Sequence, residues 1–214
     1  MRRRCLWLIP AFFSAALTAQ SAATAPAADP VAALGFSYRL PSDWTLVASK
    51  PQSQTATPPA VLPLQPAPKG AACIRVPETA RHGDPASVIV VVALPFDCFG
   101  QAMTADDLPG FGSGAADGLK QAFDLSAPVE SSYSLGNHPF WAERAKGNPK
   151  GHNELQYTLE IVCGVLKKSA VCWMAMAADQ ASLRAFEQMS VSLDSDAATP
   201  LVPDAAFDKA PSAP

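Results

Sequence analysis

The segment from Gly110 to Ala115 carries two spacings that are close to chemical motifs. It places Ser113 among glycines, but a nucleophile elbow needs glycines two residues to either side of the serine, where this chain has Phe111 and Ala115. The same run fits G-x-G-x-x-A, yet it follows Asp-Asp-Leu-Pro rather than the strand that a dinucleotide site requires. We therefore expect Ser113 to lie in a loop and expect no cofactor.

The histidines and acidic pairs give no clearer chemistry. His82, His138 and His152 each lie beside turn residues, without H-E-x-x-H or H-x-H spacing. This pattern predicts solvated turn histidines and no local metal site, although a metal site assembled from distant loops stays open. Asp106 and Asp107 lie where negative charge favours the start of a helix. The sequence assigns no catalytic residue, and an enzyme is the less favoured expectation.

One group of aromatic and charged residues is a candidate binding surface. Trp141 and Glu143 share one face of a predicted strand, while Phe140 and Arg144 share the other. Together with Trp173, the pair Trp141 and Glu143 forms the candidate surface. The favoured alternative is packing on the faces of a sheet, with the glutamate and arginine at its solvated margin.

The first residues have the order of a secretory signal peptide. Three arginines are followed by an apolar stretch from Cys5 to Leu17 and then by a run of small residues. The apolar stretch, at about 13 residues, is too short for a membrane-spanning helix, which needs about 20. We predict a signal peptide over residues 1–22, a secreted or periplasmic mature protein, and no stable membrane anchor.

Removal of that peptide changes the charge of the chain. Three of the 16 basic residues are lost and none of the 19 acidic ones, so 13 against 19 leaves a net charge of −6. The remaining basic residues are scattered, with Lys167 and Lys168 as the only adjacent pair. This distribution excludes the basic footprint of a nucleic-acid-binding protein. The remaining length suits one domain that folds alone, and we expect a monomer.

Four cysteines remain in the mature chain: Cys73, Cys98, Cys163 and Cys172. An even number in an exported protein favours disulfides over metal ligands, and no C-x-x-C pair is present. Residues 155–163 alternate in polarity, and a two-residue turn at Lys167 and Lys168 places Cys163 opposite Cys172. This register favours a Cys163–Cys172 disulfide and leaves Cys73 with Cys98. Buried cysteines without bonds are the alternative.

Alternation of apolar and polar residues predicts the other strands of the sheet. Residues 35–49 predict a hairpin. Residues 71–77 and 87–96 predict two neighbouring strands, the second of them apolar on both faces and central in the sheet. Residues 130–135 and 139–145 predict another hairpin around a Gly-Asn turn, with turn residues after it.

Two helices and three unstructured segments complete the prediction. A capping box at Thr104 and Asp107 precedes a helix over 115–124, which Pro109 and the glycines near it separate from a first turn. Asp179 caps a short amphipathic helix on the sheet. Composition predicts extended, mobile chain in three places: a tether at 23–32, a proline-rich loop at 51–70 and a C-terminal tail at 195–214. The single domain then spans residues 33–194.

Residues 35–44, GFSYRLPSDW, resemble the start of PsbP-like domains, in which an aromatic strand runs into proline, two turn residues and tryptophan. The predicted order of elements over 33–194 is also similar to that superfamily. The resemblance implies an α+β fold, with helices on both faces of a central antiparallel sheet in an α/β/α sandwich. It transfers no catalytic residue, because members with assigned roles mostly bind or assemble other proteins.

Three functions stay open at this point. The favoured one is an exported, non-enzymatic domain that binds a protein or a cell-envelope component. The others are a carrier of a small ligand or metal and an enzyme with dispersed catalytic residues. Clustered His, Asp or Glu residues in an apolar cleft would favour the latter two.

Overall fold

The computed structural model describes residues 32–47, 73–194 and 196–208. The predicted signal peptide, most of the tether and the proline-rich loop lie outside these ranges. The described chain has an α+β fold with a large eight-stranded sheet, a small three-stranded sheet and few helices, and all strand pairs are antiparallel. None of the described helices combines the length and the apolar character needed to cross a membrane.

The elements have the following bounds. The large sheet runs β2 (Thr45–Leu46), β3 (Arg75–His82), β4 (Ser87–Pro95), β9 (Ser169–Ala177), β8 (Tyr157–Val165), β7 (His138–Pro149) and β5 (Phe123–Leu125), and β6 (Val129–Leu135) also pairs with β7. The small sheet runs β1 (Phe36–Arg39), β10 (Ser190–Leu193) and β11 (Thr199–Pro200). The described helices are η1 (Ala32–Leu34), α1 (Phe96–Phe99), η3 (Ala105–Asp107), α2 (Leu108–Leu119) and α3 (Gln180–Glu187).

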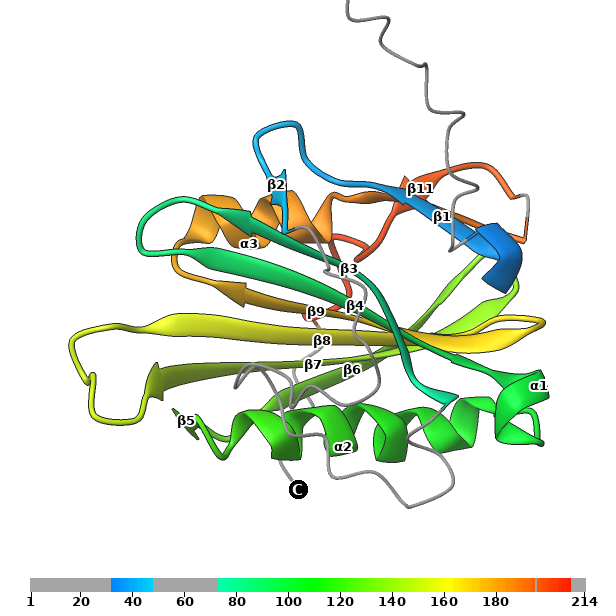
Figure 1. The fold of residues 1–214 in the computed structure, drawn as a ribbon, viewed down its shortest axis with the longest axis horizontal. Coiled ribbons are helices and arrows are strands. Elements are labelled where there is room, and N and C mark those ends of the chain that lie inside the picture. The colour runs from blue at the N-terminus through cyan, green and yellow to red at the C-terminus, as the bar shows by residue number, and fades with distance from the viewer. Residues whose placement is uncertain (1–31, 48–72, 195, 209–214) are drawn as a thin grey trace, which may run out of the picture.

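The large sheet has two covered faces (Figure 1). Helix α2 packs on one, here called the α2 face, and α3 and the small sheet pack on the other, the α3 face. Successive strand residues point to opposite faces, so each long strand supplies side chains to both cores. The α3 face holds an aromatic cluster in which the ring centroid of Trp173 lies 5.4 Å from that of Phe36 and 6.2 Å from that of Phe140. Burial of these large rings is a main source of stability.

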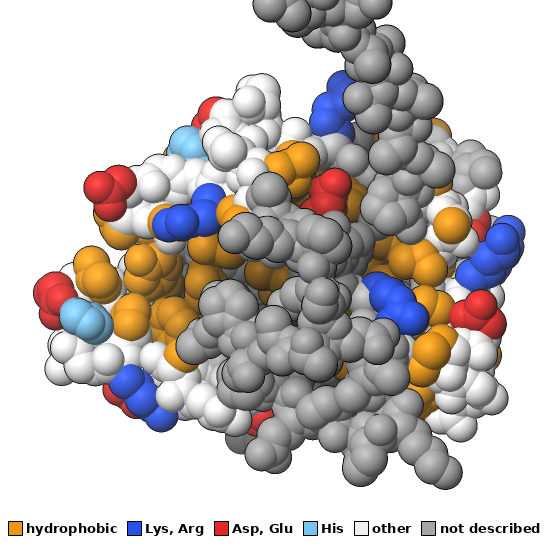
Figure 2. All heavy atoms as spheres, viewed as in Figure 1, with side chains coloured by type: hydrophobic (Ala, Val, Ile, Leu, Met, Phe, Trp, Pro, Cys, Tyr) orange, Lys and Arg blue, Asp and Glu red, His pale blue; other side chains and the backbone are white. Residues whose placement is uncertain are grey.

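The α2 face is apolar, and its cover is incomplete towards β5. Its partly buried hydrophobic residues include Val88, Phe123, Leu125, Tyr157 and Met176. Hydrophobic side chains gather at the left of the space-filling view, where the sheet above α2 is visible (Figure 2).

The predicted register of β8 and β9 is confirmed. Cys163 pairs with Cys172, and Leu166 donates its N–H to the Ser169 carbonyl at 2.8 Å across the two-lysine turn. Both predicted disulfides are present, with Cα–Cα distances of 4.1 Å for Cys163–Cys172 and 5.5 Å for Cys73–Cys98. Two disulfides are consistent with an oxidising location outside the cytoplasm.

The bounds predicted for the first long helix, 115–124, are wrong. The predicted capping box is present, but α2 begins at Leu108 directly after it and runs without a break to Leu119. Pro109 stands in the first turn, where its missing N–H breaks no intrahelical bond. A Cβ atom on Gly112 would lie 2.0 Å from the Trp141 ring, so this glycine permits close packing on the sheet. Ser113 lies on the exposed side of this helix, not in a loop.

The hairpin predicted for 35–49 is also wrong. Its turn forms, since Trp44 donates its N–H to the Pro41 carbonyl at 3.1 Å, but the two strands join different sheets: β1 pairs with β10 and β2 with β3. The predicted neighbours β3 and β4 do pair, and β4 is central between β3 and β9. The predicted hairpin of β6 and β7 is confirmed, although β7 continues to Pro149 through residues expected to turn.

The C-terminal tail differs most from its prediction. Residues 199–208, here called the strap, lie against the body. Leu201 and Val202 are buried, and their N–H groups donate to the carbonyls of Met189 and Glu187 at 2.9 and 3.0 Å. Composition averaged over 195–214 hides these two apolar residues among prolines and small residues. Their burial offsets the conformational entropy that the tail loses when it becomes ordered.

Candidate functional site

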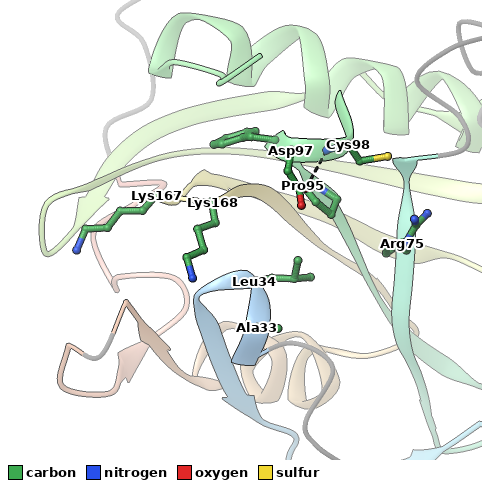
Figure 3. Close-up of a pocket in the computed structure, with 9 residues that line it drawn as sticks. Ala33, Leu34, Arg75, Pro95, Asp97, Cys98, Lys167 and Lys168 are labelled. Carbon is green, nitrogen blue, oxygen red and sulfur yellow. Dashed lines mark hydrogen bonds between the residues drawn. The ribbon is translucent and has the colours of Figure 1, made fainter. Parts of the chain in front are cut away.

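A cleft of about 550 Å³ opens at the end of the large sheet where β4 passes into α1 and β8 turns into β9 (Figure 3). This volume is within the range of roughly 300–1,000 Å³ that is typical of ligand sites. Its lining combines charged and apolar side chains: Ala33, Leu34, Arg75, Pro95, Phe96, Asp97, Cys98, Lys167 and Lys168.

Hydrogen bonds and a disulfide connect the elements that form the cleft. Ser169 donates its hydroxyl to the Leu34 carbonyl at 2.9 Å, which ties η1 to the start of β9. Phe96 donates its N–H to the Lys168 carbonyl at 2.9 Å, which ties α1 to the two-lysine turn. Cys98, at the opposite end of the lining, is bonded to Cys73 just before β3. The walls are therefore fixed to one another although they come from distant parts of the sequence.

The charges of the cleft favour an anion. Lys168 and Arg75 stand on opposite sides of it, while Lys167 extends along the rim away from the other labelled residues (Figure 3). The one carboxylate of the lining, that of Asp97, accepts a hydrogen bond from the Cys98 N–H at 2.8 Å. Three cationic side chains and one carboxylate thus line a cavity in a chain whose net charge is negative. Such a site attracts anionic groups.

Asp194 supports the lysine turn from behind the cleft. Its backbone has a φ of 46°, which is uncommon for a residue other than glycine. Its Oδ2 accepts a hydrogen bond from the Lys167 N–H at 3.4 Å, and its own N–H donates to the Gly35 carbonyl at 2.7 Å. A Cβ atom on Gly35 would lie 2.6 Å from Asp194 Oδ1, so a glycine is needed at that junction. Asp194 thereby joins the end of β10 to two walls of the cleft.

The prediction of solvated histidines is wrong for His138. This residue is buried beside Asp194, with its Nε2 at 3.5 Å from Asp194 Oδ2 and its Nδ1 at 3.3 Å from the Val165 carbonyl oxygen. His152 is exposed and lies 3.1 Å from Glu154, as expected of a turn residue. Within the part of the chain that the structure describes, no group of three His, Cys, Asp or Glu residues has a geometry that could hold a metal ion.

The candidate surface predicted from Trp141, Glu143 and Trp173 is not assembled. Trp141 pairs across the strands with Cys163, whereas Trp173 pairs with Val162, so the two indoles lie on opposite faces of the sheet. Both are buried, at 3% and 0% exposure. Glu143 lies on the α2 face, where burial and the charge of Glu130 raise the pKa of its carboxyl.

Sequence reasoning missed most of the cleft. The adjacent lysines were visible, but Arg75 and Asp97 carried no signal that they lie near them. Their proximity depends on the pairing of β4 with β9, in which Pro95 lies opposite Ser169. That pairing brings α1 beside the lysine turn, and no local pattern in either strand specifies it.

Neither a scan against protein-family models nor a search of curated protein sequences finds a match to this chain.

Proposed function

We propose that this chain is an exported, non-enzymatic binding domain with a PsbP-like α/β/α sandwich, secreted or periplasmic after loss of its signal peptide. It binds an anionic group of a protein or cell-envelope component in the cleft beside the lysine turn. The observation that carries this proposal is the cavity of about 550 Å³ with Arg75, Lys167 and Lys168 in its lining.

The lining favours binding over catalysis. Among the described residues that form it, the only cysteine is Cys98, whose sulfur is bonded in a disulfide and is no free thiol, and the Asp97 carboxylate already accepts a hydrogen bond. Lys167 and Lys168 supply adjacent cations, which attract and orient an anion. The PsbP-like assignment is supported by a helix on each face of an antiparallel sheet, and the exported location by two disulfides.

The proposal is tested with two anionic probes, inorganic phosphate and vesicles of phosphatidylglycerol, with phosphatidylcholine vesicles as the neutral comparison. Binding to the mature protein is followed by backbone amide shifts for phosphate and by co-sedimentation for vesicles. We expect an anion to shift the amides of Lys167 and Lys168, and we expect binding to weaken as salt is added.

Lys168→Glu is expected to weaken binding about tenfold or more, since a hydrogen bond to a charged group contributes about 1.5–3 kcal/mol. Lys150→Glu is the matched control, because it makes the same charge change at an exposed position in the connection from β7 to β8. Equal losses in the two variants would show a general charge effect and overturn the cleft as the site. Absence of binding to both probes by the wild-type protein would also count against it.

A further inference from the structure

A partly buried ion cluster lies on the α3 face, away from the cleft. Arg144 donates its Nε–H to Glu160 Oε2 at 2.7 Å and its Nη2–H to Glu187 Oε1. Glu160 has no exposed surface, and its Oε1 is buried without a hydrogen-bond partner among the described residues. The single guanidinium of Arg144 therefore pairs with two carboxylates. When both are ionised, the cluster carries an excess negative charge that is costly to bury.

The strap lies against this cluster. The guanidinium carbon of Arg144 is 3.9 Å from the centroid of the Phe207 ring, within the range of a cation–π contact. Tyr133 donates its hydroxyl to the Leu201 carbonyl at 3.0 Å, and Ser131 donates to the Ala206 carbonyl. Side chains of β6 and β7 thus hold the strap in addition to the backbone bonds at Met189 and Glu187. Arg144 takes part both in the cluster and in the contact with the strap.

The groups around Glu160 set its response to pH. Burial raises the pKa of Glu160 to about 7, and the charge of Glu187 adds to the rise while Arg144 opposes it. Burial and the Glu160 charge raise the pKa of Tyr133, on β6, which stays neutral. On β9 the residue opposite Glu160 is Ala175, which has no charge. The strap carries Asp204, which accepts a hydrogen bond from Gln188 at 3.1 Å.

We propose that the Arg144–Glu160–Glu187 cluster makes docking of the strap proton-dependent, with uptake of one proton by the cluster tightening the strap and its release loosening it. A protonated Glu160 removes the excess charge and leaves Arg144 to pair with Glu187 under the Phe207 ring. The strap continues back along the chain to Asp196, whose Oδ2 lies 4.0 Å from His138 Nε2 beside the cleft. His138 also lies 3.5 Å from Asp194, which supports the lysine turn, so the segment that leads into the strap is linked through His138 and Asp194 to one wall of the cleft.

Thermodynamic linkage between proton binding and docking of the strap gives the direction of the pH effect. Docking places the Phe207 ring over Arg144, the partner of Glu160, and so excludes water from the cluster. Because burial already raises the pKa of Glu160 above the ordinary 4.5, this added exclusion of water makes the docked state bind a proton more tightly than the undocked state. Docking strengthens as pH falls through a window below about 7, by at most about tenfold per pH unit. Below that window Glu160 is protonated in both states, and above it Glu160 is ionised in both.

The experiment is hydrogen exchange of the full mature chain between pH 5 and 8, with rates corrected for the intrinsic effect of pH. We expect the protection of the Leu201 and Val202 amides to fall as pH rises to 7. Glu160→Gln should keep the strap protected at every pH and abolish the slope. Glu143→Gln is the matched control, because it changes a glutamate of raised pKa on the opposite face and should leave the strap's slope intact.

A second measurement tests the proposal even if the Glu160→Gln variant does not fold. Phe207→Ala weakens the strap, so by reciprocity it must lower the midpoint at which the Glu160 carboxyl titrates, measured by ¹³C NMR. A strap whose protection is independent of pH in the wild-type protein overturns the proposal. So does a slope that survives Glu160→Gln, or a Glu160 midpoint that Phe207→Ala does not move.

Discussion

The two faces of the large sheet are closed by different physical means. The α2 face is covered, incompletely towards β5, by one helix that approaches the sheet through Gly112, and its core is apolar around the Cys163–Cys172 disulfide. The α3 face is closed by a helix, the small sheet and the strap, and it contains the partly buried ion cluster of Arg144, Glu160 and Glu187. Packing and a covalent bond stabilise the first face, whereas the second also buries a carboxylate whose charge is costly unless it is paired. The α3 face should therefore respond to pH more strongly than the core of the α2 face.

The largest effect is expected from Arg144→Met. This change leaves the Glu160 carboxylate buried without a compensating charge, which costs about 3–5 kcal/mol of unfolding free energy at pH 8. At pH 5 the loss should be smaller, because burial raises the pKa of Glu160 to about 7 and the carboxyl is then neutral. The measurement is the free energy of unfolding in urea at the two pH values.

The double variant Arg144→Met/Glu160→Gln is the control. It removes the charge together with its partner and should recover most of the stability at pH 8, since replacing a whole buried ion pair is often close to neutral. An equal loss at pH 5 and pH 8 in the single variant would show that Arg144 acts through packing on Phe207 alone, and the contrast between the faces would then fail.

The α2 face was also the more predictable of the two. Alternation in β8 placed Leu159, Ile161 and Cys163 on one side, and the turn of two lysines then set the register that pairs Cys163 with Cys172. These are local signals, because a hairpin register depends on a turn and on the residues next to it. The length of α2 was underestimated for a reason that is not local, since Gly112 packs against a tryptophan that is distant in sequence.

The α3 face and the cleft depend on contacts that no local pattern encodes. Composition predicted a mobile tail, yet Leu201 and Val202 are buried, and Phe207 lies on Arg144 from β7. The cleft likewise needs β4 beside β9 before Asp97 and Lys168 can line one cavity. Long-range strand pairing decides both, and a single sequence without its pairing partners does not specify it.

The next largest effect on stability is expected from removal of the Cys163–Cys172 disulfide, which lies on the α2 face. Cys163→Ala/Cys172→Ala should lower the unfolding free energy by about 2–3 kcal/mol, as expected from the loss of a crosslink that closes a short loop. Both cysteines lie on the face away from the strap. The pH dependence of strap protection should therefore be unchanged, and hydrogen exchange measures it. If strap protection changed less with pH in this variant than in the wild type, the two faces would not respond to pH independently of each other.

The smallest effect tests how α2 approaches the sheet. Gly112→Ala and Gly114→Ala gain the same helix propensity, of up to about 1 kcal/mol, because both positions are inside α2. Only the first meets an obstacle: its Cβ atom would lie 2.0 Å from the Trp141 ring, while nothing lies within 4 Å of a Cβ atom at Gly114. Overpacking should make Gly112→Ala less stable than the wild type by about 1–3 kcal/mol, whereas Gly114→Ala should be more stable. The unfolding free energy of both variants is measured in urea. Helix propensity cancels in the difference between the two values, which then reports the contact of residue 112 with Trp141. Equal stabilisation by both changes would mean that Trp141 does not pack directly under the helix and that the α2 face is closed less tightly than its geometry indicates.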